Sequence, residues 1–82
     1  SEAQREVWRQ LIAAFGLQVD SLVDTITKLE ASRVPEQNKL DVAIQYGDTL
    51  REGIQKDILA SIDAKIASWT SDKIFYESLI KT

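Results

Sequence analysis

The chain contains no cysteine and no histidine, and these two absences exclude many kinds of functional site. Disulfide frameworks, Cys/His zinc sites, cysteine nucleophiles and Ser-His-Asp triads each require one of the two residues. Phosphate-binding loops and nucleophile elbows are missing as well, because no Gly-x-x-x-x-Gly-Lys or Gly-x-Ser-x-Gly segment occurs. We therefore expect no enzyme activity, no cofactor and no bound metal ion.

Glycine and proline are scarce, with three and one residues among 82, which argues against a turn-rich β-sandwich. The longest uninterrupted apolar run, residues 11–15, is too short for a membrane-spanning helix. The 13 acidic and 10 basic residues are spread evenly along the chain and give a net charge of -3, so we expect neither a nucleic-acid nor a membrane partner. The length is that of one domain, residues 1–82. We favour a cytoplasmic location.

Apolar residues recur at alternating steps of four and three in the first third of the chain, the spacing of one helix face. They are Trp8, Ile12, Phe15, Val19, Leu22, Ile26 and Leu29. As heptads they occupy positions a and d, a pattern that resembles a coiled coil. Because this register is the same on both sides of Gly16, we predict one helix over about residues 2–32.

Pro35 predicts the end of this helix, since proline disfavours helical dihedrals in the residue before it and suits the first turn of a new helix. We expect a short connection there, with a second, antiparallel helix beginning between Pro35 and Lys39. A rival start lies just after Gly47, where Thr49 and Glu52 have the spacing of a capping box.

A second apolar series predicts the other long helix. It comprises Leu40, Ile44, Leu50, Ile54, Ile58, Ile62, Ile66 and Trp69. Residues 70–72 would cap a short third helix that folds back over the hairpin; the alternative is that the second helix simply continues through them. We expect Trp8 and Trp69 to meet at the open end of the hairpin. The expected fold is all-α: an antiparallel hairpin of two long helices plus a short C-terminal helix, forming a helical bundle on self-association.

Several carboxylates stand four residues ahead of a lysine, a spacing that indicates solvated helix surfaces rather than metal sites. These pairs are Asp24 with Lys28, Glu52 with Lys56, and Glu77 with Lys81.

The surplus of apolar helix face is the feature that bears on function, because a bare hairpin buries little of it and self-association would cover the rest. We predict a non-enzymatic protein-interaction module of adaptor or assembly type, which forms a homo-oligomer, with a dimer favoured, or binds a helix of another protein. The alternative is a small helical subunit, or a chaperone, of a secretion or filament apparatus. The candidate interaction residues are Arg51, Ile54, Ile58, Ile62, Lys65, Phe75 and Tyr76.

Overall fold

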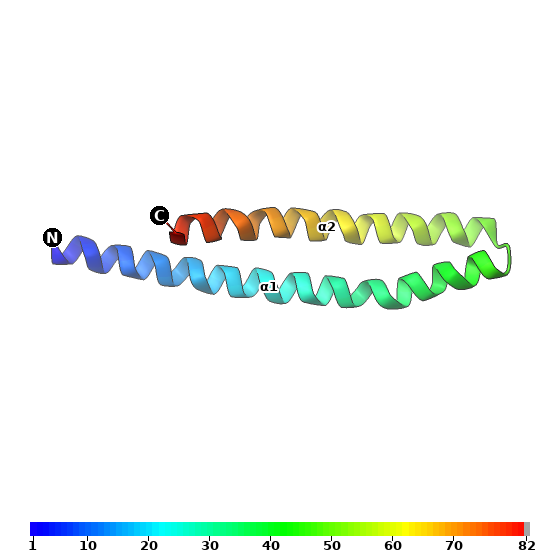
Figure 1. Ribbon diagram of the computed structural model, residues 1–82, viewed down its shortest axis with the longest axis horizontal. Coiled ribbons are helices and arrows are strands. Elements are labelled where there is room, and N and C mark those ends of the chain that lie inside the picture. The colour runs from blue at the N-terminus through cyan, green and yellow to red at the C-terminus, as the bar shows by residue number, and fades with distance from the viewer. Residues whose placement is uncertain (82) are drawn as a thin grey trace.

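The computed structural model describes residues 1–81 as two helices joined by one tight turn (Figure 1). Helix α1 spans Glu2–Gln45, helix α2 spans Thr49–Lys81, and the two run antiparallel side by side (Figure 1). The molecule is a rod of 68 × 14 × 13 Å. Its radius of gyration is 19.3 Å, whereas a compact chain of this length would have about 12 Å. The all-α prediction is confirmed for the described residues.

Helix α1 continues through Pro35, so the predicted first helix of residues 2–32 and the predicted turn at this proline are wrong. Pro35 has no N–H to donate to the carbonyl of Ala31, but both residues are exposed, so water can hydrate that carbonyl. The helix bends in this part of its length (Figure 1), as expected beside an interior proline. Beyond the bend, Leu40 and Ala43 are buried against α2, and their burial offsets the local cost of the proline.

The turn lies instead at Gly47, the rival position. Gly47 adopts φ of +66°, a left-handed conformation that glycine tolerates best. The Gly47 amide donates to the carbonyl of Ile44 at 3.1 Å and the Asp48 amide to that of Ala43 at 2.8 Å, the two bonds of a Schellman motif. Asp48 then caps α2, since its carboxylate accepts a hydrogen bond from the Arg51 amide at 3.1 Å. The second helix therefore begins at Thr49, not between Pro35 and Lys39.

The predicted short C-terminal helix is absent, because α2 runs without interruption from Thr49 to Lys81. The position of the turn explains this difference. With the turn at Gly47, α2 has to continue past residue 70 to cover the first half of α1, and the ring of Tyr76 packs there on Phe15 with a centroid distance of 6.0 Å. The last turns of α2 therefore cover α1 directly and do not fold back on the hairpin.

The N-terminal part of α1 extends beyond the end of α2 (Figure 1). A capping box starts the helix: the Ser1 hydroxyl accepts from the Gln4 amide at 3.3 Å, and the Gln4 side chain accepts from the Ser1 amine at 3.0 Å. Trp8 lies in this extension and is 48% exposed. Trp69 precedes Tyr76 by seven residues, about 10 Å along α2, so the predicted meeting of the two tryptophans at the open end is wrong.

One line of side chains between the helices forms the core, and we call it the seam. It follows the heptad spacing on both helices, and all of its residues except Trp69 are buried or half-buried. On α1 the seam consists of Phe15, Val19, Leu22, Ile26, Leu29, Arg33, Glu36, Leu40 and Ala43. On α2 it consists of Glu52, Gln55, Leu59, Ile62, Ile66, Trp69, Lys73, Tyr76 and Ile80. The stripe predicted from Phe15 to Leu29 therefore faces the second helix.

Polar residues interrupt the seam near its middle. Arg33 of α1 forms a two-bond ion pair with Asp63 of α2, with Nε to Oδ1 at 2.6 Å and Nη2 to Oδ2 at 3.3 Å. Glu36 Oε2 and Gln55 Oε1 are buried and, among the described residues, find no hydrogen-bond donor. These two oxygens weaken the helix pair, because a buried acceptor without a donor loses its hydration and gains nothing in return.

Replacing Gln55 by Leu is expected to stabilise the hairpin by about 1–3 kcal/mol, the cost of burying an unsatisfied polar group. For a chain of this size each kcal/mol raises the melting temperature by about 4–8 °C. Circular dichroism melts at one fixed protein concentration measure the effect. Gln10→Leu, on the exposed N-terminal part of α1, is the matched control and should change the melting temperature little. A Gln55→Leu protein that melts at or below the wild-type temperature would contradict the burial of this side-chain oxygen without a hydrogen-bond donor.

Candidate interaction surface

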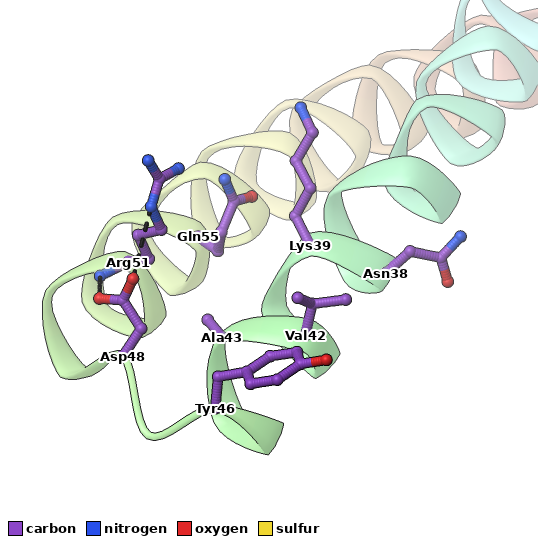
Figure 2. A pocket seen from close by; sticks show the side chains of 8 residues that line it. All are labelled: Asn38, Lys39, Val42, Ala43, Tyr46, Asp48, Arg51 and Gln55. Carbon is purple, nitrogen blue, oxygen red and sulfur yellow. Dashed lines mark hydrogen bonds and ion pairs between the residues drawn. The ribbon is translucent and has the colours of Figure 1, made fainter.

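Two broad faces flank the seam, and each combines residues of both helices. We call the first one the basic face. A shallow groove of about 450 Å³ near the turn lies on it and brings Lys39 and Val42 of α1 and Tyr46 of the turn next to Arg51 and Gln55 of α2 (Figure 2). Heptad steps from Lys39 and Val42 on α1, and from Arg51 and Ile54 on α2, extend the face along the rod. Its charged residues are Lys28, Lys39, Asp48, Arg51, Lys65 and Asp72, a net charge of +2.

We call the opposite broad face the acidic face. A groove at the open end lies on it and places Gly16 and Asp20 of α1 beside Glu77 and Lys81 of α2. Heptad steps extend this face in the same way. Its carboxylates are Glu2, Glu6, Asp20, Glu30, Asp41, Asp63 and Glu77, and its cations are Arg9, Lys56 and Lys81, a net charge of -4.

The charge of the chain is thus divided across the rod, although it is even along the sequence. The even spread of charge along the sequence conceals this division, because residues of like charge recur at helical spacing and not in runs. The signal was present in the sequence as a difference in charge between the two flanks of the heptad pattern.

Three of the four cations on the basic face pair with carboxylates three or four residues away. These ion pairs are Lys28 with Asp24 at 2.8 Å, Lys39 with Glu36 at 3.2 Å and Arg51 with Asp48 at 3.4 Å. The hydrogen bond from Lys28 to Asp24 raises the pKa of the lysine above its ordinary value. The Lys28 and Arg51 pairs are exposed and contribute little free energy, so these two cations can exchange partners at small cost. The side chain of Glu36, the partner of Lys39, is only 20% exposed. Lys65 forms no ion pair within residues 1–81.

The carboxylates of the acidic face are less well paired. Asp20, Glu30 and Asp41 form no ion pair with any described residue, and Asp41 only accepts a hydrogen bond from the amide of Gln37 at 3.0 Å. Glu77 pairs with Lys73 at 3.2 Å and not with Lys81 as predicted. The acidic face therefore presents carboxylates that a cationic surface can neutralise.

The two other predicted carboxylate–lysine pairs are formed. Asp24 pairs with Lys28 at 2.8 Å, and Glu52 pairs with Lys56 at 3.4 Å. Both pairs lie within one helix, as the spacing of four residues requires.

Five of the seven predicted interaction residues lie together on the basic face. They are Arg51, Ile54, Ile58, Lys65 and Phe75. Phe75 is the most exposed of the apolar ones, at 58%. The other two residues, Ile62 and Tyr76, lie in the seam, where Tyr76 contacts both Phe15 and Phe75.

The α1 half of the basic face was not predicted from the sequence. Lys39, Val42 and Tyr46 reach this surface only because the turn lies at Gly47 and places them beside α2 (Figure 2). With the turn predicted at Pro35, these residues would belong to the same helix as Arg51, and no contact across two helices would be expected.

The described residues offer no other obvious site. Within residues 1–81, no three acidic side chains come close enough together to hold a metal ion. Neither helix contains, in the part described, an apolar stretch long enough to cross a membrane. In comparisons with known proteins, no family model, curated protein or solved structure matched the chain. The two broad faces are therefore the main candidate interaction surfaces.

Proposed function

We propose that this chain is a non-enzymatic protein-interaction module that self-associates by packing its helix faces into a larger bundle. Surface area carries the proposal. The chain exposes 6010 Å², whereas a compact monomer of its mass exposes about 4,900 Å². The difference, about 1,100 Å², exceeds the roughly 800 Å² that each partner contributes to a standard interface.

The apolar part of this surface supports the same proposal. Only four of residues 1–81 are buried, namely Leu22, Leu40, Ala43 and Leu59. Large apolar side chains remain exposed on both broad faces, for example Val42 and Phe75 on the basic face and Ile44 and Ile74 on the acidic face. Covering such side chains with a second copy would add the hydrophobic stabilisation that one copy lacks.

The N-terminal extension of α1 provides a further surface for association. Val7, Trp8 and Leu11 are exposed there. Trp8 continues the heptad register of the seam, so a further helix packed against this part would cover it as α2 covers the rest of α1.

Light scattering after size exclusion tests the proposal. The mass is measured at about 10 µM and about 1 mM, a range that covers weak and moderate dissociation constants. We expect the mass at the higher concentration to exceed the 9.2 kDa of one chain. A mass of one chain at both concentrations would overturn the proposal.

A second candidate, a subunit of a filament apparatus, is favoured by the opposite charges of the two broad faces. A closed module would reach one fixed mass, whereas a filament subunit would gain mass with concentration and form fibres visible by negative-stain microscopy.

A further inference from the structure

We infer that copies of the hairpin stack in parallel and in register, with the acidic face of one copy on the basic face of the next. The inference rests on the proposed self-association and specifies its geometry. The occupant of each face is a second copy of this chain, and the support comes from three features of the faces: their charges, their exposed apolar side chains and their small residues.

Charge complementarity is the first feature. In a parallel stack in register, residues of equal number lie at equal height, and a difference of two residues is about 3 Å along the helix. Three carboxylates of the acidic face then lie at that small offset from lysines of the neighbouring basic face. These pairs are Glu30 with Lys28, Asp41 with Lys39 and Asp63 with Lys65 of the next copy. Asp63 already binds Arg33, but half of its side chain remains exposed for a second cation.

Exposed apolar side chains match at both ends of the rod. Near the turn, Ile44 of the acidic face lies at the height of Val42 and Tyr46 of the next basic face. Near the open end, Ile74 lies at the height of Phe75. Each of these five side chains is more than half exposed in one copy, so stacking would bury apolar surface at both ends of the interface.

Small residues lie between these two ends on α2. The acidic face carries Gly53, Ala60 and Ala67 at heptad spacing, all of them exposed. Nothing lies within 4 Å of the place that a side chain on Gly53 would occupy. Two helices approach each other most closely over such residues, which would bring Asp63 near Lys65 of the neighbouring copy.

A symmetric dimer through either broad face would place like charges together. In a dimer through two basic faces, the four cations of one copy would face the four cations of the other. In a dimer through two acidic faces, seven carboxylates would face seven carboxylates. Like-charge contacts of this kind cost free energy and suppress the pairing. Stacking of unlike faces avoids them, and it leaves one acidic and one basic face free at the ends, so the assembly grows beyond two copies.

Two variants with one neutralised face each test the inference. The basic-face variant carries Lys28→Gln, Lys39→Gln, Val42→Gln and Phe75→Gln. The acidic-face variant carries Glu30→Gln, Asp41→Asn, Ile44→Gln and Ile74→Gln. All eight positions are exposed, so both variants should keep the helical content of the wild type, which circular dichroism verifies.

We expect each variant alone to have the mass of one chain at a concentration at which the wild type is larger than a dimer. An equimolar mixture should double the mass and stop there, because only one intact face of each kind is present. A variant that still dimerises by itself would overturn the inference in favour of a symmetric interface, and two variants that assemble like the wild type would show that other surfaces mediate association. A wild type that stays monomeric would overturn the proposed function as well.

Discussion

Replacing Leu22 by Asp is expected to unfold the hairpin, with loss of most of its helical circular dichroism signal. Leu22 is the most completely buried residue described, at 3% exposure, and it lies in the seam opposite α2. A carboxylate at this position would lose its hydration without gaining a partner, which costs more than about 4 kcal/mol. Small domains have a total stability of about 5 kcal/mol or little more, so this one substitution should remove nearly all of it.

Leu17→Asp is the matched control for this prediction. Leu17 lies on the same helix, but its side chain is 72% exposed on the outer side of α1. A charge there should change the stability by no more than about 0.5 kcal/mol. If Leu22→Asp melted like the wild type, or if both variants unfolded equally, the packing of Leu22 between α1 and α2 would be contradicted.

Replacing Pro35 by Ala is expected to stabilise the protein by up to about 3 kcal/mol, the penalty of proline inside a helix. The alanine amide can donate to the carbonyl of Ala31, a hydrogen bond that is missing in the continuous helix α1. Urea denaturation at a concentration where the chain is monomeric measures the change as a higher midpoint with an unchanged slope.

Gly47→Ala should have the opposite effect. Gly47 has φ of +66°, and an L-residue adopts that conformation at a cost of about 1 kcal/mol or more. If the chain turned at Pro35 and were helical at Gly47, alanine would be neutral or destabilising at position 35 and stabilising at position 47. The signs of the two changes therefore decide where the hairpin turns.

The helical phase of the chain was predictable from sequence, and the position of the turn was not. The stripe from Phe15 to Leu29 repeats often enough to fix which side of α1 faces α2. Pro35 and Gly47 both carry local signals for a helix end. Proline removes only one hydrogen bond on the exposed side, whereas Gly47 supplies the left-handed residue that a Schellman turn requires, and Asp48 caps the next helix.

The candidate surface was predictable in part, because the sequence shows which residues share one side of a helix but not which helix sides pack together. Arg51, Ile54 and Phe75 share one flank of α2 whatever the position of the turn, because helical spacing alone places them there. The pairing of that flank with Lys39 and Val42 depends on a tertiary contact between α1 and α2. The opposite charges of the two broad faces emerge only after both helices have been placed in register.

Cross-linking of single cysteines tests most directly whether unlike faces meet. Because the natural chain has no cysteine, Lys39→Cys and Asp41→Cys each introduce one unique thiol, on the basic and the acidic face respectively. With a short bismaleimide, we expect neither variant alone to form a covalent dimer, whereas a mixture of the two should form one in high yield. Efficient dimer formation by Lys39→Cys or Asp41→Cys alone, with no gain on mixing, would show that like faces meet and would contradict parallel stacking.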